Sequence, residues 1–238
     1  MRKFSVFLLA LPLILFTSGM AGALTLDDSE GSWSNVQGTS VFSFVNDVAV
    51  GIGDGNEDQV RWGTPQSSAG DSGLGFTGTA TPVVGILPDD PFEVGILRHF
   101  NNVISGATAA EAVDLDITLS FSDPSASGSF GFTLFINETP NSPGPPDSDD
   151  IITFPASFPD ETIDIGGELF TLELLGFGDA PDDLMDFFGS PEGSTNQISL
   201  WAQITEPVES VPEPATLLLL GSGLLGLAGY GRKKFFNK

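Results

Sequence analysis

The segment VDLDITLSF, residues 113–121, alternates apolar and polar side chains without interruption. A period of two places the apolar side chains on one face of an extended chain, and this predicts a half-buried β-strand. Residues 130–136, 169–175 and 197–204 show the same alternation. Further strands are expected at residues 41–50, 92–100 and 150–154.

Polar turns rich in glycine and proline separate these segments, and helical periodicity is nearly absent. Many strands joined by polar turns predict an all-β fold, either an antiparallel β-sandwich or a jelly roll. The chain contains no cysteine, so an exported domain would have no disulfide support and would depend on core burial, with or without a bound metal.

The first residues have the features of a secretory signal peptide. Arg2 and Lys3 precede a short apolar run, and Ala21 and Ala23 form an A-x-A cleavage site. We therefore expect a cleaved signal peptide at residues 1–23.

A second apolar run lies near the other end of the chain. Residues 215–230 carry no charge, and as a helix they would be about 24 Å long, slightly less than a hydrocarbon core of roughly 30 Å. The basic residues Arg232, Lys233 and Lys234 follow at once. We expect a single hydrophobic helix that enters the inner membrane transiently, with its basic end in the cytoplasm.

The order VPEP, apolar run and basic cluster closely resembles the PEP-CTERM protein-sorting signal. The resemblance implies that Pro212, Glu213 and Pro214 are recognised by an exosortase-type membrane enzyme. It also implies export to the cell surface or extracellular matrix of a Gram-negative bacterium that makes exopolysaccharide. The expected organisation is a signal peptide, a β-sandwich domain, a linker and a sorting signal, at residues 1–23, 24–205, 206–210 and 211–238.

The body of the chain is similar to the choice-of-anchor K domain in three stretches, residues 60–76, 93–121 and 136–141. The similarity spans roughly residues 31–205. It implies an exported surface protein, but that family has no established activity, so no catalytic residue is carried over.

Charge is divided sharply along the chain. Of the 32 acidic residues only Glu213 lies outside residues 24–210, and Arg61 and Arg98 are the only Lys or Arg residues of that segment. Such a surface repels nucleic acids and anionic lipids and attracts cations. We expect each arginine to pair with carboxylates.

Two acidic turns are candidate calcium loops. The candidate ligands are Asp54, Asn56 and Asp58 in the first turn and Asp147, Asp149 and Asp150 in the second. The first resembles the start of an EF-hand loop, but Gln59 and Pro65 occupy positions that require glycine and glutamate. It is not an EF-hand, and the simpler interpretation of both turns is a solvated acidic surface.

Aromatic residues suggest a second kind of site. Trp201 lies opposite the apolar positions of its segment, and both it and Trp62 are candidates for stacking on sugar rings. The competing interpretation is core packing. The histidine His99 is expected to be structural and bonded to a turn backbone.

These observations favour a non-enzymatic structural or glycan-associated module, with no catalytic residues and no cofactor other than calcium. Extracellular polysaccharide is the expected partner, on the basis of the sorting signal alone. Two alternatives stay open. The chain could be a secreted glycosidase, which needs two carboxylates across a cleft, or a calcium-dependent adhesin module.

Overall fold

A computed structural model describes residues 23–49, 56–79, 81–142, 146–205 and 222. Apart from the helical residue Ser222 and a 3₁₀ turn, η1 (Gly106–Thr108), the regular elements in these ranges are all β-strands. The predicted all-β fold is confirmed.

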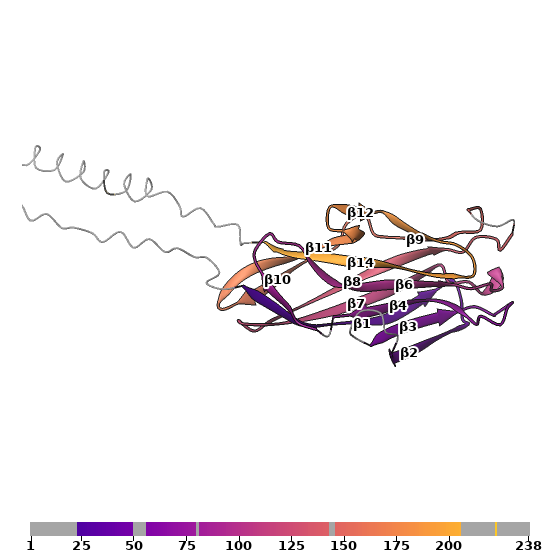
Figure 1. Ribbon diagram of the computed structural model, residues 1–238, viewed down its shortest axis with the longest axis horizontal. Coiled ribbons are helices and arrows are strands. Elements are labelled where there is room, and N and C mark those ends of the chain that lie inside the picture. Colours follow the sequence, from indigo (N-terminus) through magenta and orange to yellow (C-terminus); the bar gives the residue numbers. More distant parts are fainter. Residues whose placement is uncertain (1–22, 50–55, 80, 143–145, 206–221, 223–238) are drawn as a thin grey trace, which may run out of the picture.

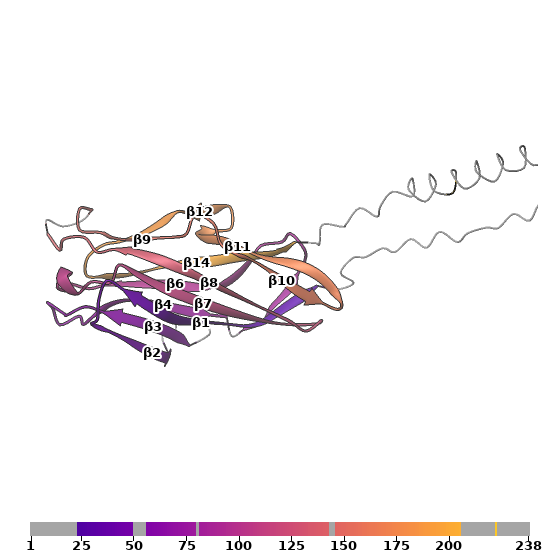
Figure 2. The same ribbon diagram turned by 180° about the vertical axis from the view of Figure 1, so that it is seen from behind.

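The strands form two antiparallel sheets (Figures 1 and 2). The smaller sheet has six strands in the order β13 (Phe187–Ser190), β9 (Asp150–Thr153), β8 (Ala126–Asn137), β7 (Ala112–Ser122), β1 (Leu24–Gln37) and β5 (Val83–Ile86). The larger sheet has eight strands, of which seven run in the order β10 (Asp160–Ile165), β11 (Glu168–Ala180), β14 (Ser194–Thr205), β6 (Phe92–Asn101), β4 (Ser72–Gly78), β3 (Glu57–Trp62) and β2 (Phe42–Val48). The eighth, β12 (Asp183–Met185), pairs with β11.

Side chains of both sheets meet in one apolar core. On β7 the side chains of Val113, Leu115, Ile117 and Leu119 are fully buried, whereas Thr118 on the opposite face is exposed. The same inward and outward alternation holds in β8, β11 and β14. The four strands that were predicted from period-two patterns are therefore confirmed, because each buries one face against the other sheet.

The longest strand, β1, is not visible as a pattern in the sequence. Its pairing with β7 contains two register shifts, between Leu26 and Asp28 and between Ser34 and Gln37. Each bulge reverses the face on which the following residues point, so the alternation is interrupted. Sequence periodicity consequently fails to predict β1, although this strand lies inside the sheet and pairs with both β7 and β5.

Strand β4 lies close to β1 of the other sheet. All seven of its residues are buried, and a Cβ atom at Gly78 would collide with the carbonyl oxygen of Ser29. Glycine is needed at this position because the two backbones approach closely.

The described part of the domain begins and ends at the same place. Leu24 of β1 and Thr205 of β14 lie at one end of the sandwich, and η1 and the start of β9 lie at the other (Figure 1). Residues 1–22, 206–221 and 223–238 lie outside the described residues, so the structure does not address the signal peptide or the hydrophobic run. Among the described residues, none belongs to a helix with the length and apolarity needed to span a membrane.

Candidate binding sites

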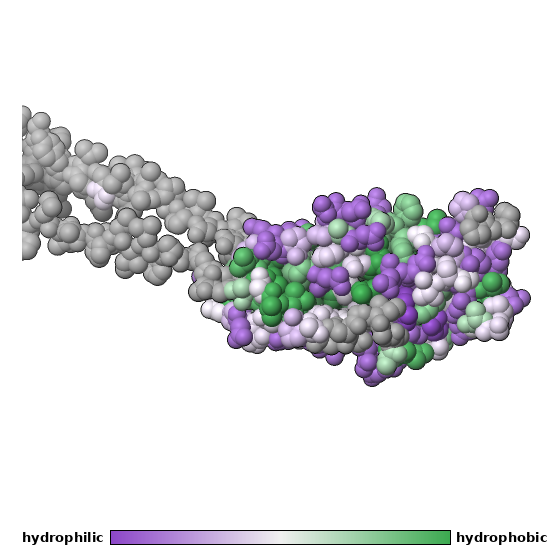
Figure 3. Space-filling view, in the orientation of Figure 1, coloured by the Kyte–Doolittle hydropathy of each residue, from purple (hydrophilic) through white to green (hydrophobic). Residues whose placement is uncertain are grey.

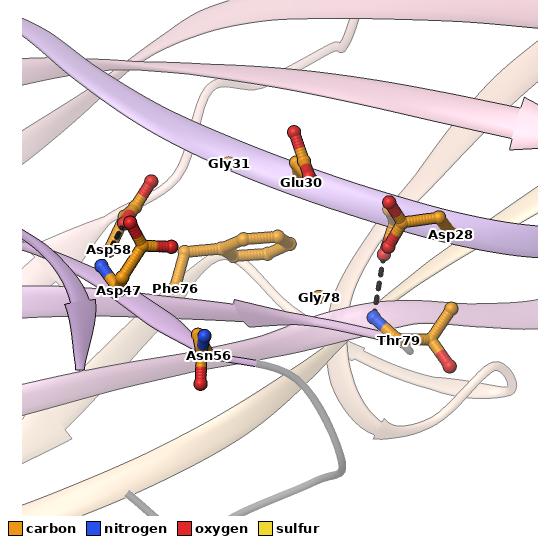
Figure 4. A pocket seen from close by; sticks show the side chains of 10 residues that line it. Asp28, Glu30, Gly31, Asp47, Asn56, Asp58, Phe76, Gly78 and Thr79 are labelled. Atoms are coloured by element: carbon orange, nitrogen blue, oxygen red, sulfur yellow. Dashed lines mark hydrogen bonds between the residues drawn. The ribbon is translucent and has the colours of Figure 1, made fainter. Parts of the chain in front are cut away.

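An acidic pocket of about 270 Å³ lies between β1 and the strands β2, β3 and β4. Four carboxylates line it, from Asp28 and Glu30 on β1, Asp47 on β2 and Asp58 on β3. Figure 4 shows the two β1 carboxylates on one side of the Phe76 ring and the other two on the opposite side. The pocket therefore combines hydrogen-bond acceptors with an apolar floor.

The backbone around this pocket is held by specific hydrogen bonds. The Asp47 backbone N–H donates to Oδ1 of Asp58 over 2.9 Å, and Asp47 has a positive φ of 59°. The indole N–H of Trp33 donates to the Asp58 carbonyl oxygen over 2.7 Å. Of the first predicted calcium turn, Asn56 and Asp58 line the pocket, and Asp54 lies outside the described residues.

A second pocket, of about 470 Å³, is lined by Trp201 of β14, by Phe92 and Glu93 of β6, and by strand β5 of the smaller sheet. The half-buried indole donates its N–H to the Gly178 carbonyl oxygen over 3.0 Å, which fixes the orientation of the ring. Glu93 is its cross-strand neighbour on β6 and accepts a hydrogen bond from Oγ of Ser199 over 3.1 Å. The walls include Val84, which is 74% exposed. On the face of the domain seen in Figure 3, apolar side chains gather between hydrophilic ones towards the end where the described chain begins and ends.

Trp62 and His99 form a different arrangement inside the core. Both side chains are fully buried, and their rings stack with centroids 6.4 Å apart and an interplanar angle of 23°. Trp62 consequently presents no surface to a glycan in this structure, in contrast to the prediction for it. Neither ring nitrogen of His99 has a hydrogen-bond partner among the described residues, so the expected bond to a turn backbone is wrong. Burial lowers the pKa of His99 to about 3, which keeps it neutral.

Both arginines of the domain lie together on the outer face of the larger sheet. Arg98 donates to Oε1 of Glu57 over 2.6 Å, so its predicted ion pair is confirmed. Arg61 instead donates to Oε1 of Gln59 over 2.9 Å, and its guanidinium carbon lies 3.5 Å from the Phe100 ring centroid. The Arg98 guanidinium also contacts this ring, at 4.4 Å. Both cations are thereby engaged within one cluster.

The second predicted calcium turn is divided by the fold. Asp147 is exposed, Asp149 is half-buried and Asp150 is fully buried at the start of β9. Burial and the neighbouring Asp150 raise the pKa of Glu138 to about 9. Burial, with Asp150 as a further cause, also raises the pKa of Glu192. The fold therefore brings Asp150 to two glutamates that sequence reasoning did not connect with it, since no local pattern links these positions.

Comparison with known protein families assigns the end of the chain. Residues 210–233 match the PEP-CTERM protein-sorting motif, and this range contains Pro212, Glu213 and Pro214. The match indicates a protein exported through an exosortase system, with a membrane-associated sorting step carried out by an exosortase-type enzyme. These three residues and Ala21 lie outside the described residues, whereas Ala23 is described and exposed.

The body of the chain is not assigned in this way. The resemblance to the choice-of-anchor K domain is not shown by the family comparison. No curated protein matches the chain.

Proposed function

We propose that this chain is a non-enzymatic module of the cell surface or extracellular matrix that binds extracellular polysaccharide in the pocket around Trp201. The observation that carries the proposal is the half-exposed indole of Trp201, which is held in one orientation beside the carboxylate of Glu93. The extracellular setting, in a Gram-negative bacterium that makes exopolysaccharide, rests on the resemblance of the tail to the sorting signal.

The chemistry of this pocket suits a sugar ring. The indole supplies a flat apolar surface, and the carboxylates of Asp90 and Glu93 accept hydrogen bonds from hydroxyl groups. Val84 and Pro91 add apolar walls. A few well-placed polar groups around an apolar surface are typical of binding sites for small ligands and for single units of polymers.

Charge restricts the class of polysaccharide. The sequence segment that contains the domain carries nearly all of the 32 acidic residues of the chain, and its two arginines contact Phe100 rather than the pocket. A strongly anionic polymer would be repelled at low ionic strength. The proposed ligand is therefore a neutral or cationic polysaccharide.

The test compares binding of the purified protein and two variants to exopolysaccharide isolated from the producing strain. Trp201→Ala removes the ring surface and should weaken binding at least about tenfold, a loss of about 1.4 kcal/mol. Leu169→Ala truncates a side chain that is 59% exposed on β11 and is the matched control, which should bind normally. Equal affinity of the wild type and both variants would reject the proposal.

The two alternatives give different results in the same assays. A glycosidase would release reducing ends from the polysaccharide, and substitution of an acidic-pocket carboxylate, such as Asp58→Asn, would abolish the release. A calcium-dependent adhesin would lose glycan binding in EDTA. Binding that survives EDTA, without release of reducing ends, is the outcome expected for the proposed module.

A further inference from the structure

Buried oxygen atoms without hydrogen-bond partners gather at the end of the domain that lies opposite Leu24 and Thr205. They include both carboxylate oxygens of Glu138 and of Glu192, and Oδ2 of Asp150. The hydroxyl oxygens of Ser148 and Ser190 also lack a hydrogen-bond partner, and both residues are fully buried. Buried polar atoms are normally paired, so a group of this size needs a physical explanation.

Strand register brings these residues together. Asp150 and Ser190 are directly opposite each other in the antiparallel pair of β9 and β13, so their side chains point to the same face of the sheet. On the other side of β9, Asn137 pairs with Ile151, which places Glu138 beside Asp150 just past the end of β8. Burial, and after it the charge of the neighbouring Asp150, raises the pKa of Glu138.

The surrounding backbone is tied down by hydrogen bonds of its own. The Thr139 N–H donates to Oδ1 of Asp150 over 2.8 Å, which leaves Oδ2 free. The side-chain amide of Asn101, at the end of β6, donates to the Ser190 carbonyl oxygen over 2.6 Å. Strands of both sheets therefore hold the free oxygen atoms in place.

Within the described ranges, no lysine or arginine neutralises the cluster of Glu138, Asp150 and Glu192. Arg61 and Arg98 are the only Lys or Arg residues in the described ranges, and both contact Phe100 in the cluster with Glu57. Ionised carboxylates that are buried without a counter-charge are strongly unfavourable. A bound cation would supply that charge and also fill the unused coordination of the oxygens.

We propose that Glu138, Asp150 and Ser190 form a divalent-cation site and that calcium is its preferred ion, with the carboxylate of Glu192 nearby adding negative charge. All the donors are oxygens, which suit hard cations, and calcium accepts about six to eight oxygen ligands in flexible geometry. Within the described ranges, no three His, Cys, Asp or Glu side chains are arranged to hold a metal by themselves. The site accordingly combines two carboxylates with the Ser190 hydroxyl, and water can complete the coordination.

Such an ion would act as a cross-link. It would join the end of β8, the start of β9 and the end of β13, and Asn101 connects the last of these to the larger sheet. The chain has no cysteine, so the ion would provide a restraint that disulfides provide in other exported domains.

The experiment is thermal melting of the full chain after treatment with chelator, at constant pH and ionic strength, with added calcium, magnesium or sodium. Calcium at 100 times its dissociation constant should raise the midpoint by about 5–10 °C, and the other two ions by clearly less. Equilibrium dialysis against radioactive calcium should show one ion per chain. An equal effect of all three ions, or no bound calcium, would overturn the proposal.

Variants locate the ion. Glu138→Gln and Asp150→Asn keep the side-chain shape, and each should reduce calcium affinity at least about tenfold. Asp147→Asn, in the exposed turn, and Asp58→Asn, in the acidic pocket, are the controls and should respond to calcium as the wild type does. If Asp150→Asn fails to fold, the calcium response of Glu138→Gln alone tests the site. This variant should fold, because the neutral amide of glutamine removes the repulsion between residue 138 and the Asp150 carboxylate. A full calcium response in Glu138→Gln, or loss of the response only in Asp58→Asn, would place the ion elsewhere and reject the site.

Discussion

Arg98 and Glu57 form an ion pair of 2.6 Å in which the glutamate side chain has no exposed surface. Glu57 lies at the start of β3 and Arg98 in β6, and β4 separates the two strands in the sheet. The pair therefore spans three strands. Gln59 and Thr77 also donate hydrogen bonds to this carboxylate, and the Arg98 guanidinium supplies the positive charge beside it.

Removal of the Arg98 guanidinium should therefore destabilise the folded domain. Arg98→Met leaves the buried carboxylate of Glu57 with the neutral donors of Gln59 and Thr77 but without its ion-pair partner, and we expect the free energy of unfolding to fall by about 3–5 kcal/mol. The double variant Glu57→Gln/Arg98→Met should recover part of the loss, because the stranded charge is gone. Urea denaturation of the three proteins measures this, and a loss below about 1 kcal/mol in the single variant would show that the pair is not needed.

Gly75 of β4 provides the space in which the Glu57 carboxylate lies. A Cβ atom at this position would collide with Cδ and both carboxylate oxygens of Glu57. We expect Gly75→Ala to destabilise the domain by about 1–3 kcal/mol through overpacking. Gly189→Ala is the matched control, since nothing lies within 4 Å of its added methyl group. Similar unfolding midpoints for the two variants would contradict the close contact.

The two faces of β7 should respond in opposite ways to a new charge. Ile117 is fully buried, and Ile117→Asp would place a charge in the core at a cost of several kcal/mol, enough to prevent folding. Thr118 is exposed, and Thr118→Asp should change stability by less than about 1 kcal/mol. Circular dichroism and soluble yield distinguish the outcomes. Comparable damage from both substitutions would mean that Thr118 is covered in solution.

Protonation of His99 should destabilise the domain in acid. Its pKa is about 3 in the folded chain against 6.5 as the ordinary value, so the unfolded chain binds more protons between these limits. Stability from this residue is therefore complete above pH 6.5 and is lost as the pH falls, by at most about 1.4 kcal/mol per pH unit.

The variant His99→Phe keeps an aromatic ring against Trp62 but cannot titrate. Between pH 6.5 and 4.5 the wild type should lose about 2 kcal/mol more stability than the variant. Urea unfolding at both pH values gives the loss of stability of each protein. The contribution of the carboxylates is the same in the wild type and the variant, so it cancels when the two losses are subtracted. Parallel losses in the two proteins would show that His99 takes up its proton without unfolding.

Replacement of Pro212, Glu213 and Pro214 by alanine should stop processing of the C-terminus, because the three residues lie within the matched sorting motif. The measurement is the C-terminal mass of the exported protein in a host with a functioning exosortase. Alanine at Thr205, Pro207 and Val208, which precede the matched range, is a control that should be processed normally. Unchanged processing of the variant without Pro212, Glu213 and Pro214 would show that these residues are not required for sorting.

Several features of this protein could be predicted from the sequence because they depend on neighbouring residues. The alternation in residues 113–121 places alternate side chains on opposite faces of any extended chain, and β7 buries the predicted face. The sorting motif is likewise a contiguous signal, and the family comparison found it at residues 210–233.

Other features were decided only by the tertiary structure. The bulges of β1 reverse its pattern, and their positions follow from pairing with β7. Glu138, Asp150 and Ser190 are separated in the chain and are brought to neighbouring positions of the sheet because β9 pairs with β8 on one side and β13 on the other. The local sequence pattern predicts which side chains of a strand point inward. Strand register, which depends on the packing of the whole sheet, decides which inward-pointing side chains meet.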